Sequence, residues 1–545
     1  MDSKYSELSE KQINEFKNIV GDNNALDQYT YRWAYSFGGI IFKENWIPDL
    51  ILLPEKTEQI SKILKLANEN NIPITPRGSG TSLSGGALTP FGGIVLDLSK
   101  MNRILKIDIE NNLVVLEPGV ICDELNEILK NYGYFFPPDP GSSSVATIGG
   151  MVANNAGGVQ AFKYGVTQNY ILSLEVVLPD GDIINLGTDV LKSVSSYNIK
   201  DLFIGSEGTL GIISKITLKI RPLPKYRKAG LFIFDDVNKI QEAAIDIRKE
   251  GIVPNLLEFM GKTILKAVKE YMGGEFQDFP SGYVLLAEVD GDSHLAVEET
   301  FSKMFDLIIQ INVFAFLVGR LKDVYGLAIR YPFIAFFGEA KHLKVAVISH
   351  MEGNLHPKFL FNENDQQDLI EFQKAMDYLY NKIIIPVGGS LTGEHGIGKV
   401  KTPYLESEHG KKVIDLMIKI KELFDPKGIL NPGTGKGDPR KLQDLPKKRN
   451  LKNQSNKTLE LRCMRCGFCQ ATCPSRLHYF SEAYSPRGRL SILNGLVHGN
   501  LRPNSLINEI FHACTLCGLC YEKCPAGVPT YMIFEKTREI LHSEG

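Results

Sequence analysis

The chain has few cysteines and histidines over most of its length, and both shortages exclude classes of protein. Of nine cysteines in 545 residues, only Cys122 lies before residue 463, and the first histidine is His294. A disulfide framework would spread its cysteines along the chain and accompany a secretion signal. The first ten residues, M-D-S-K-Y-S-E-L-S-E, have no apolar core, so we expect no such signal. We expect a reducing, cytoplasmic compartment, a metal-binding C-terminal segment, and Cys122 as a small buried apolar residue.

A strong net charge and a long apolar run are also missing. Lys and Arg number 61 against 63 Asp and Glu, for a net charge of −2, so no basic field for nucleic acid is present. The most apolar window, residues 309–338, is interrupted by Arg320, Lys322, Asp323 and Arg330. It therefore predicts buried segments rather than a membrane span. The length and ordinary composition predict two to four globular domains.

A glycine-serine loop, R-G-S-G-T-S-L-S-G-G-A-L at residues 77–88, lies between the apolar runs Ile72–Ile74 and Ile94–Leu96. A helical apolar pattern precedes it, so strand, helix and strand predict α/β or α+β architecture. The backbone N–H groups of such a loop can form a nest for an anion such as a diphosphate. The spacing matches neither G-x-G-x-x-G nor the P-loop.

Two further glycine-rich stretches follow. Residues 135–158 read F-F-P-P-D-P-G-S-S-S-V-A-T-I-G-G-M-V-A-N-N-A-G-G, and residues 205–211 read G-S-E-G-T-L-G before a predicted strand. Prolines fix an extended approach in the first stretch, and its small residues leave space for a flat ligand. One such loop is usually a solvated turn. Three of them, each joined to a strand, predict a large cofactor with a diphosphate and a flat ring.

The second half of the chain carries a group of histidines and a glutamate. His350 and His356 lie in S-H-M-E-G-N-L-H-P, and Glu394 and His395 lie in G-E-H-G-I-G. Such a set can bind a divalent metal, which would polarise a substrate as a Lewis acid. A neutral histidine with a pKa of about 6.5 can take a proton from a hydroxyl. We therefore expect a metal and proton-transfer site.

The C-terminal segment repeats one cysteine motif. C-M-R-C-G-F-C-Q-A-T-C-P recurs as C-T-L-C-G-L-C-Y-E-K-C-P, the pattern of two [4Fe–4S] clusters in which the fourth cysteine reaches the other cluster. Structural zinc, the alternative, usually pairs two C-x2-C knuckles without a distal Cys-Pro. The predicted ligands of cluster one are Cys463, Cys466, Cys469 and Cys524, and those of cluster two are Cys514, Cys517, Cys520 and Cys473.

These motifs resemble a known family. R-G-S-G-T-S-L-S-G-G, T-I-G-G-M-V-A-N-N-A-G-G and G-S-E-G-T-L-G-I resemble the FAD-binding lobe of the vanillyl-alcohol oxidase and p-cresol methylhydroxylase flavoproteins. Residues 48–433 are most similar to the branch of D-lactate dehydrogenase and the glycolate oxidase D subunit. The cysteine segment with S-P-R-G-R-L resembles the α-helical ferredoxin module of the glycolate oxidase iron–sulfur subunit and of heterodisulfide-reductase-like proteins.

The resemblance implies an α+β fold with five segments. We expect a helical lead-in at 1–45, a two-lobed FAD-binding domain of p-cresol methylhydroxylase type at 46–225, and an α/β substrate or cap domain at 226–433. A polar linker at 434–459 and an α-helical ferredoxin domain at 460–545 follow.

The resemblance also assigns residues. The FAD-binding residues would be Pro76, Arg77, Gly78, Ser79, Gly80, Thr81, Ser82, Gly85, Gly86, Pro138, Asp139, Thr147, Gly149, Gly150, Ala153, Asn154, Asn155, Gly157, Gly158, Glu207, Gly208, Gly211, Ile212 and Ile213. His395 would be the base, and His350, His356 and Glu394 would hold zinc, manganese or iron. Because no histidine precedes His294, the FAD lobe has none for covalent flavin attachment.

Two departures from the family concern the substrate lobe. The family has a histidine seven positions before His356, where this chain has Ser349 and places His350 one residue later. On a strand that shift turns the side chain to the other face, so either His350 has lost the ligand role or a bulge restores it. The segment that should supply a carboxylate-binding arginine looks shortened, and Arg320 and Arg330 are both candidates for that clamp.

Together these features predict an FAD and iron–sulfur dehydrogenase of a D-2-hydroxyacid, D-lactate or glycolate. We expect electrons to leave through the clusters to a quinone, an electron-transfer flavoprotein, a ferredoxin or an iron–sulfur partner subunit, rather than to O2 or NAD. The alternatives are an electron-relay subunit without hydroxyacid activity and a non-redox relative of alkyl-dihydroxyacetone-phosphate synthase. Peripheral association with the inner face of the cell membrane and homo-oligomerisation stay open.

Overall fold

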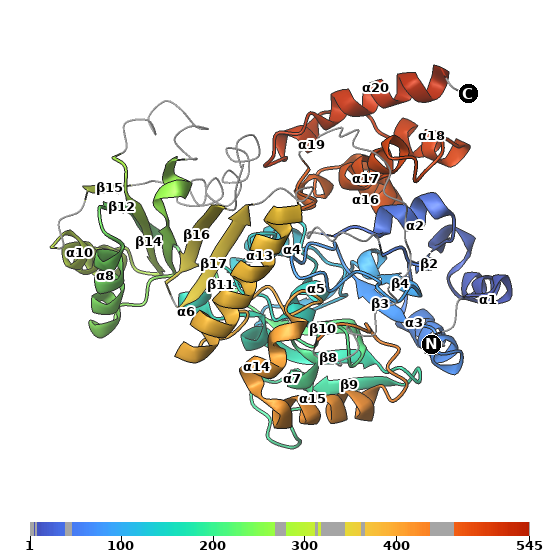
Figure 1. The fold of residues 1–545 in the computed structure, drawn as a ribbon. Coiled ribbons are helices and arrows are strands. Elements are labelled where there is room, and N and C mark those ends of the chain that lie inside the picture. Colours follow the sequence, from blue (N-terminus) through green and yellow to red (C-terminus); the bar gives the residue numbers. More distant parts are fainter. Residues whose placement is uncertain are drawn as a thin grey trace.

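Three larger sheets and a C-terminal group of helices make up the described part of the chain (Figure 1). The computed structural model describes residues 5, 8–38, 46–266, 280–310, 314–317, 344–351, 353–360, 366–435 and 463–543. Arg320 and Arg330, the predicted carboxylate clamp, lie outside these described residues, as does most of the predicted linker.

The first sheet carries the glycine-serine loop. Its strand order is β1 (Ala25–Leu26), β2 (Leu50–Leu52), β4 (Ile94–Asp97) and β3 (Ile74–Arg77), and the last three are parallel. Helix α3 (Thr57–Glu69) connects β2 to β3 and buries Ile60, Ile63 and Leu64 against them, while α1 (Glu10–Val20) packs on α3. The loop therefore leaves the carboxyl end of a buried strand, where ligands of α/β sheets commonly bind.

The second sheet is antiparallel. Its order is β5 (Ile104–Asp108), β6 (Leu113–Leu116), β10 (Ile212–Lys219), β8 (Ile171–Val177) and β9 (Ile183–Gly187). The helices beside it are α4 (Cys122–Lys130), α5 (Ile148–Asn154), α7 (Lys200–Phe203) and α15 (Lys411–Phe424). Cys122 is fully buried in this core. Short pieces β7 (Tyr134–Phe135), β11 (Arg221–Pro222) and α6 (Ala161–Tyr164) border it.

The third sheet lies beside the other two and is also antiparallel. Its order is β15 (Phe314–Leu317), β12 (Tyr226–Phe234), β14 (Tyr283–Gly291), β13 (Leu256–Met260), β16 (Lys344–His350) and β17 (Asn354–Leu360). Helices α8 (Val237–Lys249) and α10 (His294–Ile309) cover one face. The other face packs Ile348 and Met260 with Val159 of the first half, so it is turned toward the glycine-rich stretches. Helices α13 (Gln366–Tyr378) and α14 (Leu405–His409) follow.

The C-terminal group of helices contains an element from the other end of the chain. Its own helices are α16 (Pro474–Tyr479), α17 (Pro486–Val497), α18 (Ser505–His512), α19 (Leu519–Glu522) and α20 (Thr530–Ser543). Helix α2 (Tyr29–Tyr35) packs against α17 (Figure 1). Trp33 on α2 is fully buried, and its indole Nε1–H donates to the Ser491 carbonyl at 2.9 Å.

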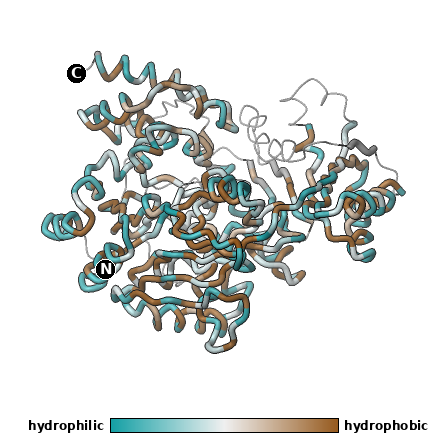
Figure 2. Tube along the Cα trace, turned by 180° about the vertical axis from the view of Figure 1, so that it is seen from behind, coloured by the Kyte–Doolittle hydropathy of each residue, from teal (hydrophilic) through white to brown (hydrophobic). Residues whose placement is uncertain are grey.

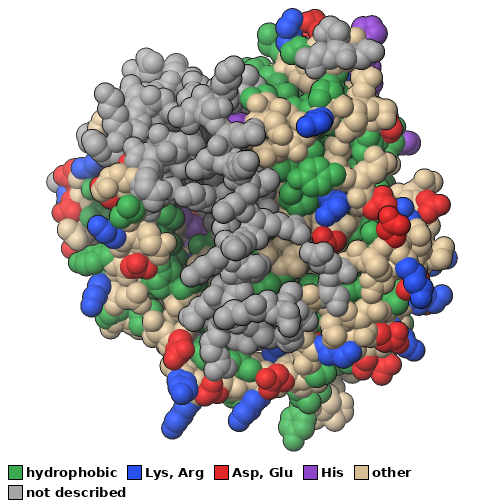
Figure 3. Space-filling view, turned by 45° about the vertical axis from the view of Figure 1, so that its right-hand side comes forward, with side chains coloured by type: hydrophobic (Ala, Val, Ile, Leu, Met, Phe, Trp, Pro, Cys, Tyr) green, Lys and Arg blue, Asp and Glu red, His purple; other side chains and the backbone are tan. Residues whose placement is uncertain are grey.

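Hydrophobic residues gather along the interior strands, and the outward faces of the peripheral helices are polar (Figure 2). Positive and negative side chains intermingle on the face drawn in Figure 3, which agrees with the small net charge. Among the described helices, none has both the length and the apolar character that a bilayer crossing requires.

Trp33→Ala should destabilise the protein by roughly 3–5 kcal/mol, because it removes a buried indole and leaves a cavity. Thermal unfolding followed by circular dichroism measures the change. Tyr197→Ala removes a ring that is 91% exposed and is the matched control, with almost no effect expected. Equal unfolding temperatures for the two variants would contradict the bridging role of α2.

Candidate functional site

The structure places the predicted FAD-binding residues at the ends of β3, α5 and β10. Pro76 and Arg77 end β3, and Gly78 to Gly86 form the loop that follows. Thr147 is the N-cap of α5, which contains Gly149, Gly150, Ala153 and Asn154, and Asn155 is its C-cap. Pro138 and Asp139 lie before this helix, and Gly157 and Gly158 follow it. Glu207, Gly208 and Gly211 precede β10, which begins with Ile212 and Ile213.

The three glycine-rich stretches contact one another. The Ser79 hydroxyl donates to the Val145 carbonyl, which joins the first stretch to the second. The amides of Gly205 and Glu207 donate to the carbonyls of Val152 and Ala153, both at 2.8 Å, which joins the third stretch to α5. The sequence patterns therefore come together in space as one surface.

Several of the glycines are required by neighbouring protein rather than by a ligand. A Cβ on Gly78 would lie 2.2 Å from the Thr147 hydroxyl, and one on Gly208 would lie 2.3 Å from the Pro76 ring. A Cβ on Gly158 would lie 2.3 Å from the Asp139 carbonyl. Real Cβ atoms do not approach so closely, so close packing of the three stretches explains these glycines without any cofactor.

The first loop nonetheless fits an anion. From Gly78 to Ser82, no backbone N–H donates to an acceptor among the described residues. A row of unpaired N–H groups in a partly buried loop is costly unless water or a ligand accepts from them. A nest of this kind suits the diphosphate of FAD.

Glu207 connects this surface to the E-H-G loop. Its carboxylate accepts from the Ile397 amide at 2.9 Å and from the Gly398 amide at 2.8 Å. Lys399 beside them is buried and donates to Gly86, Asn431 and Thr434 at 2.9–3.2 Å, and burial lowers its pKa to about 7. The sequence analysis did not single out Lys399, because its partners carry no local pattern.

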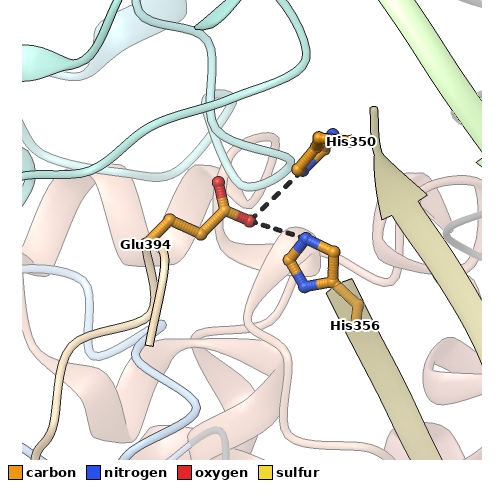
Figure 4. A group of neighbouring side chains, drawn as sticks. All are labelled: His350, His356 and Glu394. Carbon is orange, nitrogen blue, oxygen red and sulfur yellow. Dashed lines mark ion pairs between the residues drawn. The ribbon is translucent and has the colours of Figure 1, made fainter. Parts of the chain in front are cut away.

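His350, His356 and Glu394 meet beside these loops (Figure 4), and His395 contacts the same glutamate. The Glu394 carboxylate lies 3.5 Å from His350 Nε2, 3.1 Å from His356 Nε2 and 3.3 Å from His395 Nε2. The His395 side chain is 37% exposed, while those of His350 and His356 are 4% and 14% exposed. His395 is thus the ring of this cluster that is most open to an entering molecule.

The strand register places His350 in a third arrangement that neither predicted alternative described. In the β16–β17 pair, Ile348 lies opposite His356, and His350 is two residues further along the same face. No bulge interrupts this pairing. His350 therefore faces the cluster, and Ser349 turns away and donates to the Asn354 carbonyl at 2.8 Å.

Glu258 is a member of the cluster that the sequence analysis missed. It lies opposite His350 in the β13–β16 register, fully buried, and its Oε1 is 2.5 Å from His350 Nδ1. Burial alone would lower the pKa of His350. The hydrogen bonds and charges of Glu258 and Glu394 outweigh burial and raise this pKa to about 11. Burial alone would raise the pKa of Glu394, yet its three histidine partners hold it well below the usual range.

Three of these side chains could hold a metal ion. One ligand atom from each of His350, His356 and Glu394 lies within 4.8 Å of the other two. Two imidazole nitrogens and one carboxylate oxygen are a donor set that suits zinc, manganese or iron. Glu258 would then orient the second nitrogen of His350, as carboxylates commonly do behind a metal-bound histidine.

The cysteines separate into two groups with crossed membership. Burial is the main reason that the pKa of the Cys469 thiol is raised, and Cys463, Cys466 and Cys524 add to the rise. Burial likewise raises the pKa of Cys520, and Cys514, Cys473 and Cys517 add to it. The fourth cysteine of each motif therefore lies with the triplet of the other motif. We refer to these as the first and the second cysteine group.

Both triplets adopt the same unusual backbone. Arg465 and Leu516 occupy matching positions and have φ values of 57° and 55°, and Gly467 and Gly518 follow with 86° and 76°. A left-handed conformation is uncommon for arginine and leucine, so its repetition indicates a loop shaped around a ligand. The four cysteines of the second group line one common pocket. Both groups thus fit a cluster ligated by four thiolates.

Comparison with known proteins agrees with this arrangement. The FAD binding domain family matches residues 48–187, the C-terminal domain of FAD linked oxidases matches residues 223–320 and 317–434, and the 4Fe-4S dicluster domain matches residues 461–528. Glycolate oxidase subunit GlcD of Bacillus subtilis is 34% identical over 446 residues, covering 76% of this chain and 94% of that protein. A D-lactate dehydrogenase of Archaeoglobus fulgidus is 34% identical over 455 residues, covering 77% and 98%.

Solved structures show the same fold. p-Cresol methylhydroxylase with substrate bound superposes with a TM-score of 0.63 at 19% identity, over 78% of this chain and 96% of that one. An alkyldihydroxyacetonephosphate synthase gives 0.61 at 20% identity, over 79% and 87%.

The chain is a FAD-linked oxidoreductase joined to a 4Fe-4S domain. It belongs to the family of FAD-linked oxidases that includes the D-lactate dehydrogenases and the glycolate oxidase D subunits. The resemblance drawn from the sequence motifs and the predicted α+β fold class are both confirmed.

Glu258→Gln should weaken divalent metal binding about 10–100-fold, because it removes the carboxylate that orients His350. Calorimetric titration of the metal-depleted protein with zinc or manganese measures the affinity. Glu288→Gln is the matched control, because Glu288 lies on neighbouring β14 and contacts Asn255 instead of the cluster. An unchanged affinity in Glu258→Gln would contradict this role.

Proposed function

We propose that this chain oxidises a D-2-hydroxyacid of the size of D-lactate or glycolate to the 2-oxoacid. One observation carries the proposal: the histidine and glutamate cluster lies directly against the predicted flavin surface. A Cβ on Gly157 would lie 3.2 Å from Glu394 Oε2, and one on Gly396 would lie 2.9 Å from Asn154 Oδ1 and 3.2 Å from the Glu207 carboxylate. A substrate bound at His395 would therefore lie close to the FAD loops.

Each residue of the cluster would have a separate role in the reaction. FAD, when bound, supplies a two-electron acceptor for the hydride equivalent that leaves the substrate carbon. His350, His356 and Glu394 would hold a divalent metal that draws in the hydroxyl and carboxylate oxygens of the substrate. His395 Nε2, the most exposed of the ring nitrogens, would take the hydroxyl proton. Glu394 lies 3.3 Å away and would stabilise the imidazolium that forms.

Electrons would leave through two [4Fe–4S] clusters, one in each cysteine group. Such clusters carry one electron each, so the pair can take both electrons of one turnover. We propose a quinone, an electron-transfer flavoprotein, a ferredoxin or an iron–sulfur protein as the final acceptor.

His395→Ala should slow substrate-driven flavin reduction about 10²–10⁴-fold, the usual contribution of a general base. Anaerobic stopped-flow bleaching of the flavin with D-lactate, glycolate and larger D-2-hydroxyacids measures the rate. His409→Ala is the control, since His409 on α14 lies outside the cluster.

The same experiment separates the alternatives. A wild-type flavin that stays oxidised with every D-2-hydroxyacid would contradict the proposal and favour the electron-relay subunit. If D-2-hydroxyacids bleach the flavin fast in both the wild type and His395→Ala, the substrate class is supported but His395 is not the base.

Cys524→Ser and Cys473→Ser test the number of clusters. Each variant should lose the cluster of one group, so that iron content falls from about eight atoms to about four per chain. Iron analysis and electron paramagnetic resonance of the reduced protein measure the loss. A zinc signal, or an iron content near four in the wild type, would contradict the two-cluster assignment.

A further inference from the structure

A buried ionic network joins the flavin loop to the C-terminal helices. Glu482 lies between two arginines from different parts of the chain. Its carboxylate is 3.1 Å from Arg77 Nη2 and 2.7 Å from Arg487 Nη2, and all three side chains are at most 4% exposed. Burial alone would raise the pKa of Glu482, but Arg487, Arg77 and Arg476 lower it to about 2, so it stays ionised. The side chains of Arg77, Glu482 and Arg487 together carry one net positive charge in this buried contact.

Arg487 uses all five of its N–H donors here. Nε and Nη2 donate to the Glu482 carboxylate at 2.8 and 2.7 Å. The other Nη2–H donates to the Ser79 carbonyl at 2.9 Å, and Nη1 donates to the carbonyls of Gly80 and Arg465, both at 3.1 Å. One guanidinium thus contacts both the glycine-serine loop and the backbone between Cys463 and Cys466.

These contacts fix the orientation of the loop. Peptide bonds are trans throughout the described chain, and in a trans peptide the N–H points opposite to the C=O. Because the carbonyls of Ser79 and Gly80 point at Arg487, the amides of Gly80 and Thr81 point away from it. Those amides belong to the unpaired row that suits a diphosphate. Arg487 therefore stands behind the anion nest.

The backbone of the first cysteine group leaves room for this arginine. A Cβ on Gly467 would lie 2.9 Å from Arg487 Nη1. In the second cysteine group Cys473 and Cys520 are buried, but Cys517 is exposed, and no cysteine of the first group is exposed.

We propose that Arg487 is a positioning residue that holds the glycine-serine loop at 77–88 against the first cysteine group, an inference that rests on the proposed function. A cluster held by the first group would then be the first acceptor of electrons from reduced FAD, and a cluster held by the second group, which includes the exposed Cys517, would be the exit. FAD, when bound and reduced, would supply two electrons one at a time. Each of the two clusters would take one of them.

Arg487→Gln tests the placement, and Arg77 remains to pair with Glu482 in this variant. Loss of a positive charge near an anionic cluster should lower its potential. We expect the equilibrium constant for electron transfer from flavin to the first cluster to fall about tenfold, which is about 59 mV for one electron. FAD should also dissociate about tenfold faster. Redox titration with dithionite, followed by electron paramagnetic resonance, measures the potential without any hydroxyacid.

Two further variants separate the specific role of Arg487 from a general loss of structure in this region. Arg487→Lys keeps the charge but loses the five-donor geometry, so the potential should recover while FAD still dissociates fast. Arg489→Gln is the matched control, because Arg489 is equally buried and donates to Ile510, Tyr484 and Ser475, and the cysteines it interacts with, Cys473 and Cys514, belong to the second group. Arg489→Gln should leave the reduction potential of the first cluster and the rate of FAD dissociation unchanged.

The rate of flavin reoxidation in two cysteine variants tests the order of the clusters without any arginine substitution. After deazaflavin photoreduction, flavin in Cys473→Ser, which retains the first cluster, should reoxidise as fast as in the wild type. In Cys524→Ser this phase should slow at least tenfold. The reverse order, or an Arg487→Gln protein with unchanged potential and FAD release, would overturn the proposal. A protein that shows the expected order but no hydroxyacid reaction would refute only the substrate class.

Discussion

The carboxylate of Glu207 is the interaction on which the arrangement of the site depends. Its two oxygens accept from successive amides of the E-H-G-I-G loop, across 190 and 191 residues of chain. Its own amide donates to α5, and its carbonyl accepts from Asn431. Glu207 has a φ of 56°, an uncommon value for a residue other than glycine. The strain is tolerated because it aims one side chain at two amides that would otherwise be buried without partners.

The hydrogen bonds of Glu207 explain how two lobes with largely separate cores form one site. Apart from Val159, which packs with Met260 and Ile348, the buried apolar residues of the flavin lobe and of the third sheet form separate clusters, so packing alone would leave their relative position loosely determined. Hydrogen bonds have directions, and a carboxylate that bridges two amides fixes both distance and angle. The cluster of His350, His356 and Glu394 is then held against Gly157 with little freedom.

The sequence predicted well those features whose residues lie close together in the chain. The cysteine triplets and the glycine-rich stretches each carry their spacing within at most 24 consecutive residues, so their pattern can be recognised without knowledge of the fold. Glu258 lies 92 residues from its partner His350, and Lys399 lies 313 residues from Gly86. No local pattern marks such pairs. The sequence alone does not determine the orientation of His350 for the same reason, because its strand register depends on pairing with β13 and β17.

The insertion of Trp33 between helices made at the other end of the chain has a consequence for biosynthesis. Trp33 and its acceptor Ser491 are 458 residues apart. A ribosome adding about 5–20 residues per second would need roughly 20–90 seconds to cover that distance. During that time Trp33 and Ala34 lack the C-terminal residues they pack against, while Tyr35 of the same helix can already pack on Ile51 and Val95 of the first sheet. The group of helices at 463–543 is thus completed by a helix synthesised long before it, and this group expressed separately would need α2 supplied with it.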